Sequence, residues 1–234
     1  MLRLHWQKIT YLALFICASN ISFSQNKLQY QLDYDVKKVR FGYFLGVAST
    51  NYKIKYNRAY LSPVNPNTFY SITSPSTTGI KAGALVNVNL NDYFDFRFSP
   101  LSVSIYNREI LVNDSESYKQ GDKAWFEVPV QVKYKSERRG NTRMFVFGGL
   151  KYGFETNVVN KKSSAGTKLT KTSDFSVEYG FGLEIFKEYF KVTPEVHFSH
   201  GLKNIVNPNT DYTNFYSFVD KMKTHNVTFY IVFQ

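Results

Sequence analysis

After residue 38 the sequence divides into eight segments of alternating polar and apolar residues, joined by links that are alternately long and short. The segments cover residues 39–56, 79–89, 93–107, 124–134, 143–156, 174–186, 190–202 and 225–233. The long links cover residues 57–79, 108–123, 157–173 and 204–224, and the short links cover residues 89–93, 135–142 and 187–189. A closed antiparallel barrel in an outer membrane has this asymmetry, with short periplasmic turns at one end and long external loops at the other.

The sorting of the links by length predicts the fold class. We expect an all-β chain that forms an eight-stranded antiparallel transmembrane β-barrel of the outer-membrane type, with long extracellular loops and short periplasmic turns. Both termini are then periplasmic, and the protein is a multi-pass component of the cell outer membrane. In a soluble, lipocalin-like barrel we expect no systematic difference in link length between the two ends. The outward faces, which are aromatic on nearly every strand, also disfavour a soluble barrel.

Residues 1–24 have the pattern of a cleaved secretory signal peptide, with a basic start followed by an apolar stretch. The apolar stretch, residues 9–18, is shorter than the about 20 residues that a membrane-spanning helix needs. Ser22 and Ser24 place small residues at positions −3 and −1 of a cleavage site before Gln25. An uncleaved anchor helix is the alternative, which the early polar residues after the stretch disfavour.

Cys17 is the only cysteine and lies inside the predicted signal. Lipidation of Cys17 is a second alternative, but the bulky Ile16 stands where lipoprotein signals usually have a small residue. Cleavage after the signal leaves a mature chain without cysteine, and therefore without a disulfide or a thiolate site. We expect residues 25–38 to form a periplasmic N-terminal lead-in and residues 39–234 to form the barrel.

The composition agrees with a barrel and bears on the partners. Aromatic residues make up 18% of the chain, yet its mean hydropathy is negative, as expected when only every second strand residue faces lipid. Removal of Arg3 and Lys8 with the signal takes the formal charge from +11 to +9. The basic residues are spread over loops and turns, so anionic lipid or an acidic partner fits them better than nucleic acid does.

The segment 93–107 shows the expected faces most clearly. Its outward residues begin with three phenylalanines, Phe94, Phe96 and Phe98. Asp95 and Arg97 alternate with them and point inward. Pro100 then shifts the phase of the alternation, which predicts a β-bulge because proline cannot donate to the strand ladder. On the segment 174–186, we interpret Gly180 and Gly182 as small residues that relieve crowding in the interior.

Ten ionisable side chains are predicted to face the interior: Asp95, Arg97, Glu127, Lys133, Lys151, Glu155, Glu178, Glu184, Glu195 and His197. An eight-stranded barrel is just wide enough to be filled by its own side chains. Because isolated buried charges are costly, we expect these ten to form a structural polar network in the lumen. A proton or ion path and a carboxylate cluster with catalytic function are the alternatives.

The sequence assigns no catalytic, cofactor-binding or metal-binding residue. Glu195, His197 and Ser199 share one inward face and invite a hydrolase interpretation, whereas His200 belongs to the opposite face. A catalytic triad depends on mutual geometry, and no HExxH, GxSxG, CxxC or P-loop pattern occurs. The charged run 133–140 crosses a predicted turn, where we expect a solvated turn or a basic knob for an acidic partner or anionic lipid.

An ordered set of segments resembles the PorT-like (PorT/SprT) outer-membrane barrels. The segments are Phe41-Gly42-Tyr43-Phe44-Leu45-Gly46, Asn51-Tyr52-Lys53-Ile54, Phe96-Arg97-Phe98-Ser99-Pro100 with Leu101-Ser102-Val103, Glu127-Val128-Pro129-Val130, Lys133-Tyr134-Lys135-Ser136, Gly148-Gly149-Leu150-Lys151-Tyr152, Pro194-Glu195-Val196 and Ser199-His200-Gly201-Leu202-Lys203-Asn204. The resemblance covers nearly the whole mature chain. It implies an outer-membrane barrel of the type IX protein secretion and gliding-motility machinery, with no enzyme activity and no catalytic motif.

The expected function is therefore an accessory component of a type IX translocon that acts by protein–protein contact. Its expected partners are outer-membrane lipid and lipopolysaccharide, and larger translocon proteins. We expect no cofactor, no nucleic acid and no small-molecule substrate. A small outer-membrane solute channel is the main alternative, and a lumen-based lipid-modifying enzyme centred on His197 and Glu195 is a further one.

Overall fold

The computed structural model describes residues 29–58, 71–112, 116–156, 170–206 and 219–234. Within these residues a short 3₁₀ helix and nine β-strands form, and eight of the strands are long. The elements are η1 (Leu32–Tyr34), β1 (Val39–Tyr56), β2 (Ile72–Thr73), β3 (Thr77–Asn89), β4 (Phe94–Val112), β5 (Glu116–Lys135), β6 (Thr142–Thr156), β7 (Ser173–Phe186), β8 (Lys191–Gly201) and β9 (Val219–Phe233).

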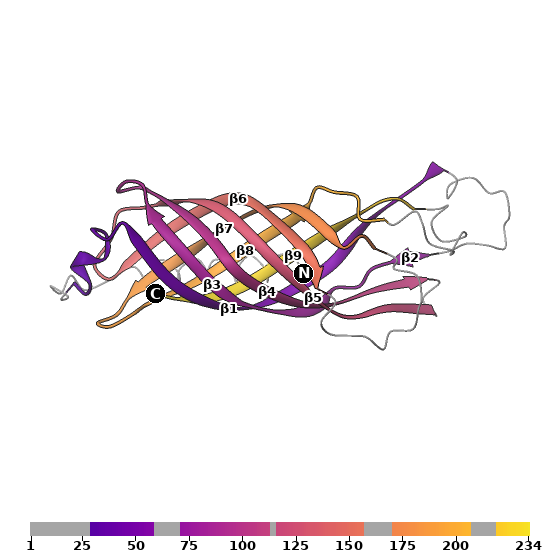
Figure 1. The fold of residues 1–234 in the computed structure, drawn as a ribbon, viewed down its shortest axis with the longest axis horizontal. Helices are drawn as coiled ribbons and strands as arrows, with labels where there is room; N and C mark the ends of the chain where they lie inside the picture. The colour runs from indigo at the N-terminus through magenta and orange to yellow at the C-terminus, as the bar shows by residue number, and fades with distance from the viewer. Residues whose placement is uncertain (1–28, 59–70, 113–115, 157–169, 207–218) are drawn as a thin grey trace, which may run out of the picture.

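The long strands close into one antiparallel barrel (Figure 1). Each pairs with the next long strand along the chain, and β1 also pairs with β9, from Tyr43 opposite Phe233 to Lys55 opposite Lys221. The prediction of an eight-stranded antiparallel barrel is therefore confirmed. In Figure 1 the C-terminus and η1 lie at the left-hand end and β2 lies at the right. We call these the turn end and the loop end.

The two faces of the strands alternate as predicted. On β1, Phe41, Tyr43, Leu45 and Val47 are exposed and the residues between them are covered. The β-bulge at Pro100 is also confirmed, because the β4–β5 register shifts between Phe98 and Val103. Apolar residues resume on the outer face at Leu101, Val103 and Ile105. Nearly every strand thus presents an apolar outer surface and a polar inner one, which suits contact with acyl chains.

Three of the long links each contain several strand residues that the sequence did not predict. The prediction of a loop over residues 108–123 is wrong, because β4 continues to Val112 and β5 begins at Glu116. In the sequence the added end of β4 contains three consecutive apolar residues, Ile110, Leu111 and Val112, and the added start of β5 is mostly polar. Because the two strands pair with each other, their backbone hydrogen bonds are satisfied. The link 204–224 is likewise shortened by β9, which begins at Val219, and the link 57–79 contains β2 paired with the end of β4.

Apolar side chains close the loop end of the interior. The cluster consists of six buried residues: Tyr52, Ile72, Ile110, Ile205, Val219 and Met222. They come from four strands and from the segment after β8, where the amide of Ile205 donates to the carbonyl of Met222 at 3.0 Å. Burial of this apolar surface favours a compact arrangement of the strand ends beyond the apolar outer belt. Among the described residues no helix has the length and apolar character to cross a membrane.

The described part of the lead-in folds into the turn end of the barrel. Tyr34, on η1, is only 8% exposed, contacts Phe186 edge-on at 5.3 Å and donates its hydroxyl to Gln234 Oε1 at 3.0 Å. Burial raises the pKa of Tyr34 above its ordinary value. Asp35 accepts a hydrogen bond from Arg143 at 2.9 Å. The lead-in therefore covers the turn end of the interior.

The charged run 133–140 is only partly a solvated turn: residues 136, 137, 139 and 140 are exposed as expected, but the two lysines on β5 are not. Lys133 and Lys135 are fully buried inside the barrel, because inward alternation continues to the end of β5. Arg138 donates to the carbonyl oxygens of Tyr30 and Gln31 in the lead-in. Partial burial lowers the pKa of Arg138 below its ordinary value. The run thus holds the lead-in against the barrel.

Candidate functional site

The structure places all ten predicted lumen residues on the inner face of the barrel. Nine of them are buried: Asp95, Arg97, Glu127, Lys133, Lys151, Glu178, Glu184, Glu195 and His197. Glu155 is half-buried near the loop end, where it pairs with Lys123 at 3.2 Å. Every one of the ten therefore follows the inward parity of its strand. The interior contacts divide into a turn-end cluster and a central chain.

Two carboxylates organise the turn-end cluster. Glu184 on β7 accepts from Arg143 Nε and Lys191 Nζ, each at 2.7 Å, and is also hydrogen-bonded to Lys133. Three cations from three strands thus surround a single carboxylate that is itself wholly buried. Buried ion pairs of this kind offset part of their desolvation cost only when the geometry is good and the remaining polar atoms are satisfied.

Asp95 on β4 is the second carboxylate of the turn-end cluster. Its Oδ1 accepts from Arg40 Nη2 at 2.8 Å and from Lys135 Nζ at 2.7 Å. Arg40 and Arg143 also approach Asp35 of the lead-in, at 3.7 and 2.9 Å. The cluster therefore connects the lead-in electrostatically to strands on several sides of the barrel.

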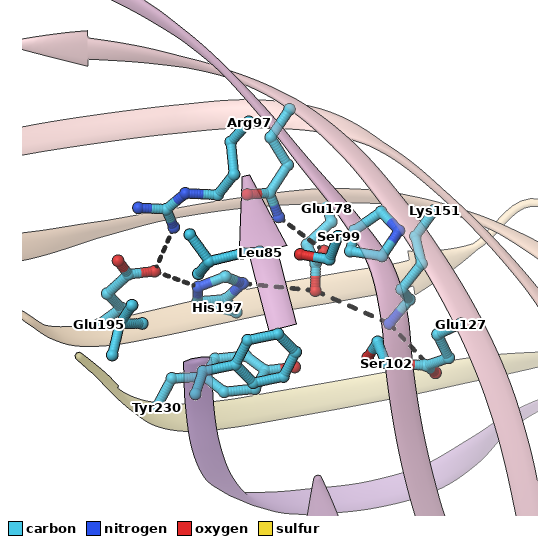
Figure 2. Close-up of a pocket in the computed structure, with 14 residues that line it drawn as sticks. Leu85, Arg97, Ser99, Ser102, Glu127, Lys151, Glu178, Glu195, His197 and Tyr230 are labelled. Carbon is cyan, nitrogen blue, oxygen red and sulfur yellow. Dashed lines mark hydrogen bonds and ion pairs between the residues drawn. The ribbon is translucent and has the colours of Figure 1, made fainter. Parts of the chain in front are cut away.

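The central chain crosses the middle of the interior (Figure 2). It begins with Arg97 Nη1, 2.6 Å from Glu195 Oε2, whose other neighbour is His197 Nε2 at 2.8 Å. Nδ1 of His197 lies 3.5 Å from Glu178, and Glu178 lies 3.7 Å from Lys151 Nζ. The chain ends where Lys151 approaches Glu127 at 3.5 Å. Acidic and basic side chains therefore alternate along the whole chain.

Glu127 is bound on three further sides. Lys81 Nζ lies 3.0 Å from it, the hydroxyl of Tyr106 donates to it at 2.7 Å, and the hydroxyl of Ser104 does so at 3.1 Å. Its carboxylate is thus held from β3 and β4, in addition to Lys151 on β6. This density of partners is what stabilises an ionised carboxylate in a dry interior.

Sequence reasoning missed several members of these networks. Their shared feature is a buried cation at an inward position: Arg40, Lys135, Arg143 and Lys191. Most of them stand at the first or last inward position of a strand, close to a predicted turn. Arg40, Arg143 and Lys191 already lie inside the expected segments, so the period-2 alternation applied to the first residues of each segment was the signal that could have found them. Lys135 lies one residue past the end of its expected segment.

The surroundings of His197 do not form a hydrolase site. Its ring is packed between Phe147 and Tyr230, with ring centroids 4.3 and 4.4 Å away. The hydroxyl of Ser199 donates instead to Ser176 at 3.3 Å. Nucleophilic catalysis requires the base within hydrogen-bond reach of the nucleophile, and here the imidazole contacts two carboxylates.

The interior is filled by these side chains. Two cavities inside it, one beside His197 and one beside Trp125, measure about 20 and about 10 Å³. Each is about the space that one water molecule needs. In the described part of the chain, no group of three histidine, cysteine or acidic residues is placed to hold a metal ion. The arrangement can neutralise charge and exclude solvent.

A closed eight-stranded barrel with an apolar outer face and a packed polar interior defines a transmembrane β-barrel of the outer-membrane class. The chain belongs to the family described as the outer membrane protein beta-barrel domain, whose model matches residues 23–207. It is therefore an outer-membrane β-barrel protein. Comparison with curated proteins found no significant match.

Solved structures of several outer-membrane proteins resemble this chain at low sequence identity. OprG from Pseudomonas aeruginosa is 14% identical, with 83% of this chain and 92% of that chain covered and a TM-score of 0.46. Neisserial surface protein A is 9% identical, with coverages of 84% and 98% and a TM-score of 0.45. Ail of Yersinia pestis is 12% identical, with coverages of 84% and 98% and a TM-score of 0.37.

Proposed function

We propose that this outer-membrane barrel is an accessory component of the type IX secretion system that acts by protein–protein contact. The observation that carries the proposal is the filled interior, in which the central chain and the turn-end cluster occupy the space a solute would need. A barrel without a passage acts through its outer surface and its two ends. The PorT-like segments support assignment of that activity to type IX secretion.

The turn end offers a surface for such contact. Apolar side chains stand exposed there on the lead-in and on two turns: Leu32, Val36, Leu90 and Tyr189. Tyr189 is 86% exposed, which is high for a large aromatic side chain. Exposed apolar groups collected at one end of a molecule are typical of sites that bind another protein.

Planar-bilayer recording separates this proposal from the solute-channel alternative. We expect the purified protein to insert without steady conductance, because cavities of about 20 and 10 Å³ do not join into a water-filled path. A porin inserted in the same bilayer provides the positive control. Steady, protein-dependent current from the wild-type barrel would overturn the contact proposal and favour a channel.

A gene deletion tests the proposed pathway. We expect the deletion to abolish secretion of type IX cargo while other outer-membrane proteins remain at normal levels. Complementation with Leu90→Ser/Tyr189→Ser should restore the barrel but not full secretion, because both side chains lie on exposed turns. His197→Phe serves as a comparison, since an enzyme centred on His197 would lose function through it. Normal cargo secretion by the deletion strain would rule the proposal out.

A further inference from the structure

A basic patch lies on the outer face of β1 and β9 at the loop end. On β1 the apolar outer residues end at Val47, and on β9 they end at Val227. Beyond these points the outward positions are first Ser49 and Asn51 on β1 and His225 on β9, and then four lysines, Lys53, Lys55, Lys221 and Lys223. The patch therefore lies beyond the end of the acyl-facing belt, on the same side of the sheet.

The strand register places these lysines in like-charged pairs. Lys53 is directly opposite Lys223, and Lys55 is directly opposite Lys221. Like charges that face each other across neighbouring strands destabilise a sheet. None of the four forms an ion pair with a described residue. This differs from the buried lysines of the interior, which have carboxylate partners.

Two histidines extend the patch toward the apolar belt. His225 follows Lys223 at the next outward position of β9, and it is opposite His200 on β8. Their Nδ1 atoms are 3.0 Å apart, and Tyr179 holds Nε2 of His200 at 3.1 Å through its hydroxyl. A hollow of about 410 Å³ is lined by Lys53, His200 and His225 on this side and also by Tyr52 and Ile72 of the apolar cluster at the loop end. The patch thus combines donors with an adjoining recess.

We propose that this patch binds the phosphorylated headgroup of a lipid of the outer leaflet. The lysines supply the charge that a phosphate requires, and the histidines and Tyr179 supply further hydrogen-bonding groups beside it. The apolar belt below, ending at Val47, Val227 and Phe198, faces the acyl chains of the same molecule. A ligand that carries both phosphate and acyl chains can contact the basic patch and the apolar belt together. An acidic protein segment would contact only the patch, so the lipid fits this surface better.

The proposal takes the loop end as the outer-leaflet end, in line with the lengths of the links, and it does not depend on the type IX assignment.

The test titrates the detergent-solubilised mature chain with bisphosphorylated lipid A and counts bound lipid by native mass spectrometry. Lys53→Gln/Lys223→Gln removes one of the facing pairs. At about 1 kcal/mol for each lysine near an anionic lipid surface, we expect binding to weaken roughly 30-fold.

Lys38→Gln/Lys187→Gln is the charge-matched control, because both residues are exposed at the turn end. We expect it to bind lipid A as the wild type does. Dephosphorylated lipid A should bind the wild type weakly, and excess inorganic phosphate should compete only weakly, because it lacks acyl chains. Equal losses in both double variants, or equal binding of phosphorylated and dephosphorylated lipid A, would overturn the proposal.

Two further readouts keep the test decisive. Lys53→Gln/Lys223→Gln should fold at least as well as the wild type in lipid-free detergent, since it removes a repulsion, so heat modifiability on gels verifies the barrel. A polyglutamate peptide probes the other source of negative charge. If that peptide binds the patch more tightly than lipid A does, the patch serves an acidic protein and the lipid proposal fails.

Discussion

Glu184→Gln is expected to lower the free energy of unfolding by about 3–5 kcal/mol, the range measured when one partner of a buried ion pair is removed. The carboxylate of Glu184 is fully buried and is the shared acceptor of Lys133, Arg143 and Lys191. Glutamine keeps the size of the side chain but leaves Lys133 and Lys191 without the negative charge that balances them, and leaves Arg143 with Asp35 alone. The loss therefore comes from uncompensated charge and not from a cavity.

Urea unfolding of the barrel reconstituted in lipid vesicles, followed by tryptophan fluorescence, measures this loss. Glu188→Gln is the matched control, because Glu188 is exposed in the turn between β7 and β8 and only four residues away. Its effect should stay within about 0.5 kcal/mol, as for other exposed substitutions. A Glu184→Gln barrel as stable as the control would show that the turn-end cluster contributes little to stability.

Gly149→Ala is expected to cost about 3 kcal/mol or more, at the upper end of the range for overpacked sites. A Cβ on Gly149 would lie 2.1 Å from the carbonyl oxygen of Val130 and 2.7 Å from the Cα of Gln131. Both atoms belong to the backbone of β5, so no side-chain rotation relieves the clash. The β5–β6 pairing must spread locally to accept one methyl group.

The neighbouring glycine provides the control for this prediction. A Cβ on Gly148 would have no atom within 4 Å, because Gly148 faces outward. Gly148→Ala should be neutral or slightly stabilising, since glycine within a strand is costly relative to alanine. The folded fraction on gels and the urea midpoint, measured for both variants, test the pair. Equal behaviour of the two variants would contradict the close β5–β6 packing.

Period-2 alternation was sufficient to predict which side chains face lipid and which face the interior. It placed Asp95 and Arg97 inward on either side of Phe96, and Pro100 indicated the bulge correctly. These features are local, because the face of a strand residue depends only on its parity within the strand. The end of β4 was missed because the consecutive apolar residues Ile110, Leu111 and Val112 interrupt the alternation, and the start of β5 was missed because its mostly polar sequence lacks the apolar contrast that the pattern requires.

The pairing within the lumen could not be read from the sequence. Arg97 and Glu195 are 98 positions apart, and only the stagger of the strands around the barrel brings them together. The contact between Gly180 and Phe147 could not be predicted from the sequence either. A Cβ on Gly180 would lie 2.6 Å from the phenylalanine ring. The sequence predicted small residues for the interior at this strand, which the contact confirms, but it did not identify the ring that needs the space.

The seam between β1 and β9 has a consequence for biogenesis. It joins residues as distant as Tyr43 and Phe233, so the first strand has no second neighbour until the last strand has been added. Until that step the polypeptide is an open sheet with two edge strands. The backbone N–H and C=O groups of these edges are unpaired, because acyl chains form no hydrogen bonds. Circularisation therefore comes last, and a chain truncated before β9 would remain a substrate for quality control rather than a resident of the bilayer.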